Sequence, residues 1–447
     1  MLDLKLIRND PERVKQALAR RDPQLSALVE EIVALDEQWR AATASAESLR
    51  AKQKQDSEQV AAGKRAGDDV SGLLDAIKQT SADVKTLTAQ AGAAEERLQS
   101  ELARLPNLPD PTAAAGPEDE VVRLVGEPPK LDFEPRDHLE LAGRLIDMDA
   151  GARLSGARFA YLRGDLVMLE LALVRYVLEK LAGYGFEPII PPVLVRERAL
   201  YGTGFLPDTE QQIYRLADDD LYLVGTSEVA LASLHDGELI EAQRLPLRYA
   251  GFSPCFRREA GAAGKDTRGI FRVHQFDKVE MFSFVPPEDS ASEHERILSI
   301  EEEILSELEL PYRVLNIAVN DLGSSAAKKY DCEAWLPGQG RYRELTSCSN
   351  TTDYQARRLQ IRMRREGVGG GGEAGGGEAA GSDAGGRGRG SGGRRENETL
   401  HTLNGTAVAV GRTIVALLEN GQRADGSVQL PERLVAYGAP RELAAAV

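Results

Sequence analysis

Cysteine is scarce in this sequence of 447 residues. The three cysteines, Cys255, Cys332 and Cys348, are too few and too scattered for a disulfide framework or a zinc cluster. We therefore expect reduced thiols and no structural zinc. The N-terminal segment also lacks an apolar run long enough for a signal peptide or a membrane span. The resulting expectation is a cytoplasmic protein with no membrane partner.

Positive charge is in short supply as well. The formal net charge is −16, from 55 Lys and Arg against 71 Asp and Glu. This balance argues against general coating of nucleic acid, but it permits one local basic surface that binds a polyanion. Apolar residues make up 42% and charged residues 28%, as in ordinary globular proteins, and the length suffices for two or three domains.

The clearest repeat lies near the N-terminus. Over residues 25–60 the core positions recur at alternating steps of three and four, which is the heptad pattern of a coiled coil. After a break at 63–67, the same rhythm continues over 70–98. Two long helices joined by so short a break must lie antiparallel. We expect a helical arm over about residues 25–105, with a length of roughly 60 Å.

Basic side chains gather where these two helices are expected to meet. They are Arg50, Lys52, Lys54, Lys64 and Arg65, set against the acidic Asp56 and Glu58. A polyanion could bind at such a tip. Charged runs on coiled coils are often only solvated faces, however, and this stretch alone does not separate the two interpretations.

Three prolines, Pro106, Pro109 and Pro111, end the second long helix. We place a domain boundary there, with residues 1–110 as an N-terminal domain and residues 111–447 as a second domain.

A helical pattern opens the second domain. It covers residues 137–182 and carries an apolar stripe formed by Leu166, Leu169, Leu173, Val177 and Leu181. The segment at 186–192 contains prolines, so it can form only a short edge or interface strand.

A β-hairpin with a long charged loop is predicted next, with arms at 249–258 and 270–280. Residues that period two places on a common face are Arg257 and Glu259, then Arg272, His274, Phe276, Lys278 and Glu280. Such a surface suits a nucleotide, because arginine binds phosphate or carboxylate bidentately and an aromatic ring stacks on a base. A charged hairpin that only faces solvent would show the same pattern.

Two further stretches place polar residues at predicted strand ends. Thr226, Ser227 and Glu228 follow an apolar strand and precede a helix, where they could bind a small polar ligand or only cap the helix. Glu344 is expected to end a strand and is followed by hydroxyl residues. That combination suits Mg²⁺ held by one carboxylate and substrate phosphates.

The last such stretch, residues 401–422, predicts a strand, a turn at Asn404 and Gly405, and an apolar helix that carries Arg412. Taken alone, this pattern is typical of a buried helix with a snorkelling arginine.

Together these stretches resemble the signature motifs of class II aminoacyl-tRNA synthetases. The strand at 186–192, the hairpin from FRREAG to VHQFDKVE and the helix GTAVAVGR correspond to the three class motifs. Four further motifs behind the long antiparallel arm are similar to those of bacterial-type seryl-tRNA synthetases in particular. They are TSE at 226–228, HQFDKVE at 274–280, ELTSCSN at 344–350 and HTLNG at 401–405. The resemblance covers nearly the whole chain.

The resemblance implies an α+β fold, in which a catalytic domain on an antiparallel β-sheet flanked by helices follows the coiled-coil arm. It implies a ligase that condenses L-serine with ATP to seryl-adenylate, releases pyrophosphate, and passes the seryl group to tRNA(Ser) and also to selenocysteine tRNA. It further implies ATP as a substrate, Mg²⁺, and a homodimer with the 186–192 strand at its two-fold interface.

The resemblance also assigns roles to single residues. For serine it implies Thr226, Glu228, Arg257, Glu280 and Thr406; for ATP it implies Arg257, Arg258, Glu259, Val273, Phe276, Glu344, Leu345, Thr346, Ser347 and Arg412. Arg257, Glu259 and Arg412 would be the catalytic residues, Glu344 would hold Mg²⁺ with the ATP phosphates, and the basic tip, Arg50, Lys52, Lys54, Lys64 and Arg65, would bind tRNA. No protein nucleophile is needed, because the substrate carboxylate is one already.

Two features depart from the family pattern. Thr406 and Ala407 stand where Ser-Gly is commonest, which keeps a hydroxyl and adds a methyl group. A glycine-rich insertion occupies 367–395, with 15 glycines among the 27 residues 367–393, and predicts a flexible loop.

Two other functions stay open. One is an amino-acid-activating ligase that loads a carrier protein, although such relatives lack the long basic-tipped arm. The other is a non-catalytic coiled-coil RNA-binding protein, which the intact set Arg257, Glu259, Glu280, Glu344 and Arg412 disfavours.

Overall fold

The computed structural model describes residues 1–207, 212–260, 266, 268–365 and 396–446. The chain forms two compact units, each with its own core. The first comprises Met1–Glu118 and Ala318–Ala327, and the second comprises Asp119–Ile317 and Lys328–Val447. The sequence analysis placed a boundary near residue 110. The predicted insertion at 367–395 lies outside the described residues.

Four helices build the first unit: α1 (Leu4–Asn9), α2 (Pro11–Ala19), α3 (Leu25–Ala66) and α4 (Ser71–Arg104). The first two are separate because Asp10 ends α1 and caps α2, where its carboxylate accepts the N–H of Arg13 at 3.2 Å. Arg21 joins the remote segment 318–327 to this unit by donating to the carbonyl of Leu322 at 3.1 Å.

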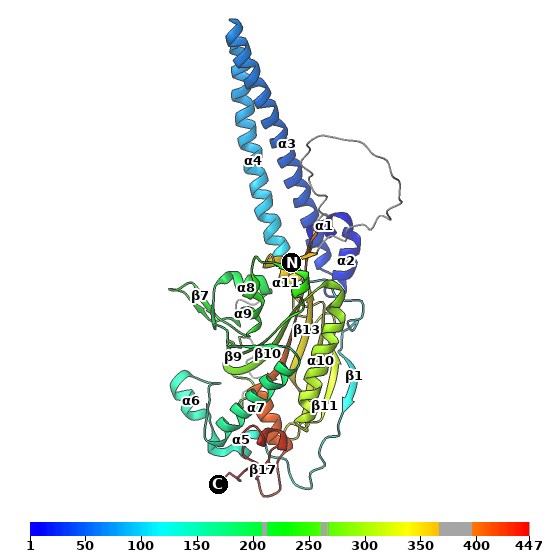
Figure 1. The fold of residues 1–447 in the computed structure, drawn as a ribbon, viewed down its shortest axis with the longest axis vertical. Coiled ribbons are helices and arrows are strands. Elements are labelled where there is room, and N and C mark those ends of the chain that lie inside the picture. The colour runs from blue at the N-terminus through cyan, green and yellow to red at the C-terminus, as the bar shows by residue number, and fades with distance from the viewer. Residues whose placement is uncertain (208–211, 261–265, 267, 366–395, 447) are drawn as a thin grey trace, which may run out of the picture. The chain divides into compact units, whose positions relative to one another are not determined.

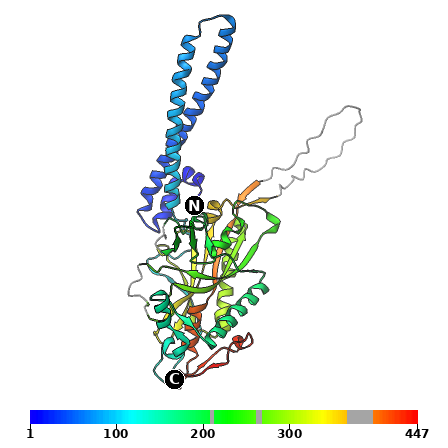
Figure 2. The same cartoon turned by 90° about the vertical axis from the view of Figure 1, so that its left-hand side faces the viewer.

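Helices α3 and α4 lie antiparallel and form the predicted coiled-coil arm (Figures 1 and 2). The positions of both predicted heptad seams are buried or half-buried. The predicted break begins too early, because α3 continues through Gly63 to Ala66 and ends at Gly67, whose φ of 84° favours glycine. The five basic residues predicted for the tip, Arg50, Lys52, Lys54, Lys64 and Arg65, are all exposed.

An eight-stranded sheet forms the centre of the second unit, in the order β1-β11-β12-β13-β16-β10-β9-β4 (Figure 1). Its strands are β1 (Glu120–Val125), β4 (Glu187–Ile189), β9 (Leu247–Phe256), β10 (Gln275–Val285), β11 (Tyr312–Asn316), β12 (Lys328–Leu336), β13 (Arg341–Thr352) and β16 (His401–Ala409). Every neighbouring pair is antiparallel except β4 with β9. The sheet and its helices confirm the predicted α+β class, and β4 is the predicted edge strand.

The helices of this unit are α5 (His138–Ala142), α6 (Met148–Ser155), α7 (Asp165–Gly183), α8 (Glu197–Thr203), α9 (Glu228–Ala232), α10 (Ser290–Glu307), α11 (Tyr354–Arg358), α12 (Val410–Asn420) and α13 (Glu432–Val435). Short strands pair beside the sheet: β2 (Ile146–Asp147) with β3 (Tyr161–Leu162), β7 (Leu221–Leu223) with β5 (Leu194–Val195) and β6 (Arg215–Leu216), β14 (Arg362–Arg365) with β8 (Leu239–Glu241) and β15 (Glu396–Thr399), and β17 (Val428–Gln429) with β18 (Glu442–Leu443). None of the helices in the described ranges has the length and apolar character that a membrane crossing needs.

The helical pattern predicted for 137–182 is correct only in part. Its apolar stripe is buried on α7, but the first half is divided among α5, α6 and short strands. Gly143 and Gly156, both with positive φ, end α5 and α6, which explains why no continuous helix forms there.

Helix α10 packs on one face of the sheet, and this packing decides where a ligand can bind. Thr346 of β13 donates to Glu301 of α10 at 2.9 Å, and a Cβ added at Gly405 of β16 would lie 2.4 Å from Ile297. Gly405 is therefore needed inside a continuous strand, and the predicted turn at Asn404 and Gly405 is wrong. Alternate side chains of β10, β13 and β16 are left for the opposite face.

The predicted hairpin is confirmed, with a shorter return arm. Phe256 of β9 pairs with Gln275 of β10, so residues 270–274 form an irregular segment rather than the start of a strand. Glu344 was expected to end a strand but lies within β13.

Candidate active site

A pocket lies on the face of the sheet opposite α10, toward which every second side chain of β10 and β16 points. It is lined by Phe205, Thr226, Glu228, Arg257, Glu259, Ile270, Phe271, Arg272, Val273, Phe276, Lys278, Glu280, Glu344, Leu345, Ser347, Asn404, Thr406, Ala409, Gly411 and Arg412. Strands β10, β13 and β16, the two ends of the β9–β10 connection, and the first turn of α12 supply most of these residues.

One end of the pocket holds two carboxylates and an ammonium group. Lys278 donates to Thr226 Oγ1 at 2.7 Å and forms an ion pair with Glu280. Asn404 joins the two carboxylates, donating to Glu228 Oε2 at 3.1 Å and to Glu280 Oε1 at 3.3 Å. With both acids ionised, this acidic end has a surplus of negative charge, which suits a ligand that carries an ammonium group.

Burial and the neighbouring Glu280 raise the pKa of Glu228 to about 7, against the opposing effects of the Gln355 hydrogen bond and the Lys278 charge. Glu228 therefore gains negative charge readily when a cation binds beside it. Thr226 Oγ1 also accepts the N–H of Glu228, the first residue of α9, at 3.2 Å, so this threonine contacts the start of the helix and also lines the pocket.

Hydroxyl and amide groups complete the acidic end. Thr406 donates to Glu280 Oε2 at 3.4 Å. Asn404 Oδ1 is buried and has no hydrogen-bond partner within the described part of the chain. A buried acceptor without a partner is costly, so a ligand with a hydroxyl or ammonium donor would gain by contacting it.

Two guanidinium groups define the other end of the pocket. Arg257 donates through Nε to the carbonyl of Gly225 at 3.2 Å, and its guanidinium carbon lies 5.3 Å from the centre of the Phe276 ring. Arg412 donates to the carbonyl of Glu344 at 3.1 Å and lies 3.6 Å from its carboxylate. Two arginines facing one pocket favour an anion with several oxygens, such as a polyphosphate.

The irregular segment 270–273 forms a wall beside these arginines. Arg272 donates to Glu259 Oε2 at 2.6 Å and so holds this carboxylate at the pocket. Phe271 lies with its ring centre 4.9 Å from the guanidinium carbon of Arg412. The wall therefore combines apolar surface with one oriented carboxylate, which suits a heterocycle that bears an amino group.

Glu344 is the candidate metal ligand. The surrounding pocket walls partly desolvate its carboxylate, which opposes ionisation, but the charges of Arg412 and Lys329 outweigh this effect and lower the pKa of Glu344. Its side chain is 43% exposed at the pocket, and Ser347 lies nearby in the lining. Across the described ranges, no group of three or more His, Cys, Asp or Glu side chains could hold a metal ion by itself. A cation here would need further oxygen ligands from a substrate, as Mg²⁺ does.

Two residues predicted to bind ATP lie away from this pocket. Arg258 is exposed, and its backbone N–H donates to the carbonyl of Gln212 at 2.9 Å. Thr346 points to α10, where it donates to Glu301. The pocket lining brings together the remaining residues predicted to bind serine or ATP. They are Thr226, Glu228, Arg257, Glu259, Val273, Phe276, Glu280, Glu344, Leu345, Ser347, Thr406 and Arg412.

Several lining residues had no assigned role in the sequence analysis. Period two groups Lys278 with Phe276 and Glu280, and that spacing is the sequence signal for it. Asn404 lies in a stretch whose local pattern predicts a turn, and that pattern conceals its place in the pocket. Phe271 is buried apolar surface, which no local pattern distinguishes from core.

The antiparallel sheet and its two-ended pocket are those of a class II aminoacyl-tRNA synthetase, and residues 212–369 match the family model described as tRNA synthetase class II core domain (G, H, P, S and T). Residues 1–109 match the model of the seryl-tRNA synthetase N-terminal domain. A serine–tRNA ligase of Streptomyces coelicolor is 49% identical over 450 residues, covering 99% of either chain. The chain therefore belongs to the seryl-tRNA synthetase family.

Solved structures agree with this placement. A seryl-tRNA synthetase from Pyrococcus horikoshii, crystallised with ATP, superposes with a TM-score of 0.90 at 38% identity and covers 100% of both chains. A cytoplasmic serine–tRNA ligase from Naegleria fowleri with AMP gives 0.82 at 32% identity, over 99% of this chain and 98% of that one. The family, fold class and ligase class predicted from the sequence are confirmed.

Proposed function

We propose that this chain activates L-serine with ATP in the pocket described above and transfers the seryl group to a serine tRNA. The observation that carries the proposal is one pocket with an acidic, hydroxyl-bearing end and a cationic end. The ammonium and hydroxyl groups of serine suit the first end, and its carboxylate together with a triphosphate suits the second. The ATP and AMP complexes of the two solved relatives support ATP as the substrate.

The acidic end explains selection of serine. Glu228 and Thr226 would receive the ammonium group, and Glu280 and Thr406 would bond the hydroxyl. Asn404 holds both carboxylates in place through its amide nitrogen. The hydroxyl that the family pattern requires is retained in Thr406, which is 7% exposed.

The cationic end explains activation. Arg257 would bind the serine carboxylate and the α-phosphate, so that the carboxylate oxygen attacks phosphorus and pyrophosphate leaves. Arg257 and Arg412 would stabilise the charge that develops during this displacement. Glu259 would accept the adenine amino group, while Phe276 and Val273 would contact the base. Catalysis is then positioning and electrostatics, without a covalent enzyme intermediate.

Mg²⁺ belongs to the proposal as a partner of the phosphates. The lowered pKa and pocket exposure of Glu344 fit a hard cation that takes few protein ligands, with Ser347 beside it. When bound, Mg²⁺ neutralises phosphate charge and orients the chain of phosphates.

Serine-dependent exchange of pyrophosphate into ATP, followed by charging of serine tRNA, tests the function. Exchange without charging would favour the alternative in which a carrier protein accepts the amino acid. Absence of exchange in the pure protein with Mg²⁺ would contradict the proposal and leave only RNA binding.

The arm is proposed to bind the tRNA. Its tip presents Arg50, Lys52, Lys54, Lys64 and Arg65 to solvent in a chain with a net charge of −16, so it provides a local basic surface. Where the source has a selenocysteine tRNA, that RNA would be a second acceptor. A cytoplasmic location belongs to the proposal, because ATP and tRNA are met there.

Removal of the arm should separate the two half-reactions. Replacing residues 43–93 with a short linker removes all five tip cations but keeps the base of the first unit, where Val29, Ile32, Leu98 and Leu102 form a buried cluster. Exchange should stay within about twofold, while charging falls steeply, because phosphate contacts supply much of the affinity for tRNA. Both assays on the same preparation provide the measurement.

A charge-reversed protein with the arm intact serves as the matched variant. Changing Lys52, Lys54, Lys64 and Arg65 to Glu should reduce charging and flatten its salt dependence by about 0.7 to 0.9 log units per lost phosphate contact. Charging that matches the unaltered protein in both variants would show that the arm has another role.

A homodimer is proposed from an exposed apolar surface. Helix α7 buries one face but exposes Met168 by 48% and Leu171 by 56%, and Ile190, next to β4, is 81% exposed. Ile190 lies in the 186–192 segment that the family resemblance places at a two-fold interface, and burial of these side chains between two copies would remove their apolar surface from water. We expect a dimer in sedimentation at micromolar concentration and a monomer after Leu171→Asp with Ile190→Asp. A monomeric unaltered protein would contradict this.

A further inference from the structure

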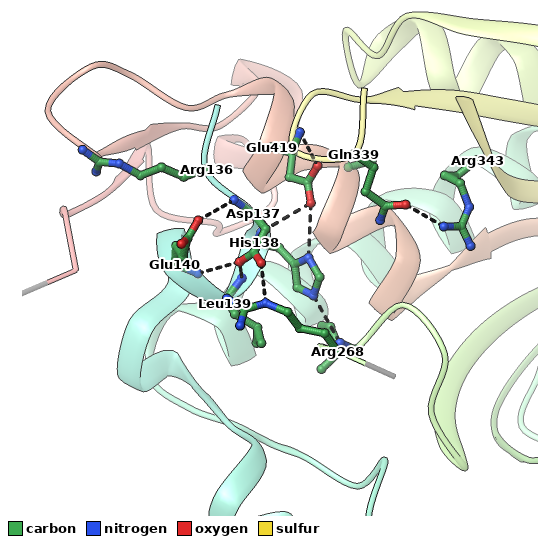
Figure 3. Close-up of polar contacts among 12 residues, drawn as sticks. Arg136, Asp137, His138, Leu139, Glu140, Arg268, Gln339, Arg343 and Glu419 are labelled. Atoms are coloured by element: carbon green, nitrogen blue, oxygen red, sulfur yellow. Dashed lines mark hydrogen bonds and ion pairs between the residues drawn. The ribbon is translucent and has the colours of Figure 1, made fainter. Parts of the chain in front are cut away.

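A buried histidine outside the pocket lies against the segment that forms the pocket wall. His138, the first residue of α5, is 3% exposed. Its Nε2 accepts the backbone N–H of Ile270 at 3.2 Å. Its Nδ1 lies 3.2 Å from Glu419 Oε1 (Figure 3). Because Nε2 is the acceptor, the neutral ring carries its proton on Nδ1 and donates it to Glu419. One imidazole thus joins α12 to the wall.

Glu419 keeps the ring in this tautomer. It is fully buried, and it accepts the backbone N–H of His138 at 3.3 Å and that of Gly338 at 3.0 Å. It lies on α12 about two turns beyond Arg412, one of the two arginines of the cationic end. The position of Arg412 and that of the wall therefore share one buried anchor.

Gly269 permits the close approach of the chain to the imidazole. Its φ is 77°, and a Cβ at this position would lie 1.9 Å from His138 Nε2. Any other residue here would push the backbone from the ring and break the hydrogen bond to Ile270. A substitution at Gly269 therefore disturbs the same contact as a substitution of His138, from the other side.

Three features at the cationic end of the pocket, where ATP is proposed to bind, depend on the position of residues 270–273. The carbonyl of Phe271 accepts Arg412 Nε at 3.4 Å, and Arg272 holds Glu259 at 2.6 Å. Val273 lines the pocket directly. The acidic end, where serine is proposed to bind, is built on α9, β10 and β16. The hydrogen bonds among its residues do not involve residues 270–273.

We propose that His138 is a positioning residue for ATP: its Nε2 holds the wall at 270–273 in the conformation that binds the nucleotide, and Glu419 fixes the tautomer that makes this possible. The inference rests on the proposed function, since it concerns ATP binding at the cationic end of the same pocket. The two ring nitrogens of His138 contact Ile270 and Glu419, neither of which belongs to the acidic end, so we expect its effect on KM for ATP rather than on KM for serine.

Two isosteric substitutions test the proposal. The side-chain amide of glutamine reaches the place of Nε2, whereas that of asparagine reaches only the place of Nδ1. His138→Asn leaves Ile270 N–H without its acceptor, and KM for ATP in serine-dependent exchange should rise about tenfold, with KM for serine within twofold. His138→Gln restores an acceptor and should keep KM for ATP within about threefold of the unaltered value.

A control and a second site make the outcome decisive. Arg268 pairs with Asp137 at 2.5 Å, but its side chain is 63% exposed, so Arg268→Ala should leave both KM values within about twofold.

Gly269→Ala should raise KM for ATP as His138→Asn does. The double variant should show less than the product of the two effects, because both break one contact.

The results separate this inference from the proposed function. Absence of exchange in the unaltered protein would overturn the proposed function itself. Normal exchange with an unchanged KM for ATP in both His138→Asn and Gly269→Ala would overturn the positioning role alone. Equal rises in KM for both substrates, or equal effects of the asparagine and glutamine variants, would also overturn it, because they would reveal a general packing defect. If His138→Asn does not fold, the Gly269→Ala and His138→Gln pair decides in the same way.

Discussion

Replacing serine by alanine as the amino acid is expected to lower kcat/KM for pyrophosphate exchange about 10⁴-fold, because a pocket built to bond a hydroxyl strongly rejects a ligand that lacks one. Alanine fits sterically, so the loss arises from polar groups left without a partner. Glu280 is 1% exposed and Thr406 is 7% exposed, which means that water has poor access to them. Glu280 and Thr406 already bond each other, so in the alanine complex it is the further hydrogen bonds, which the serine hydroxyl would make with them, that stay unmade and cannot be replaced by water.

The matched variant for this prediction is Thr406→Val, which keeps the volume and removes a hydroxyl. It should weaken serine binding while leaving KM for ATP unchanged, since Thr406 bonds Glu280 and not the cationic end. Exchange with alanine within tenfold of that with serine would show that the acidic end does not read the hydroxyl.

Arg257→Ala is expected to reduce kcat for exchange by about 10² to 10³, the usual cost of removing one group that stabilises transition-state charge. The side chain is oriented before substrate binds, because Nε donates to the Gly225 carbonyl and the guanidinium lies over Phe276. Oriented charge needs no reorganisation during the reaction, and this is why a single arginine has so large an effect.

The adjacent Arg258 provides the control. It has the same side chain one residue further on, but it is exposed and absent from the pocket lining. Arg258→Ala should keep exchange within about threefold, since an exposed cation contributes little to stability or to charge inside the pocket. Equal losses in the two variants, or near-normal exchange in Arg257→Ala, would contradict the assigned role of Arg257.

Local periodicity accounts for what could be predicted. The heptad seams of α3 and α4 are visible because every core position recurs within one helix. Phe276, Lys278 and Glu280 share a face of β10 because side chains alternate along a strand. The family motifs then added the remaining ligand residues, most of which the pocket brings together.

Helix α10 bears on two of the predictions. Thr346 was assigned to ATP with its neighbours, but alternation places it against Glu301 of α10. Asn404 and Gly405 resemble a turn locally, yet packing of Ile297 on Gly405 keeps β16 continuous. A distant helix thus decides between turn and strand at Asn404 and Gly405, whereas the side chain of Thr346 faces that helix because side chains alternate along β13.

The sequence by itself determined the arm, the hairpin, the family and the residue types of the pocket, because each is written in short-range spacing or in a contiguous motif. Only the tertiary structure decided which polar groups meet. Lys278 bonds Thr226 across 52 positions of sequence, and His138 bonds Glu419 across 281. No periodic pattern spans such separations, since these contacts form only when the sheet and its helices pack together and exclude water from the groups between them.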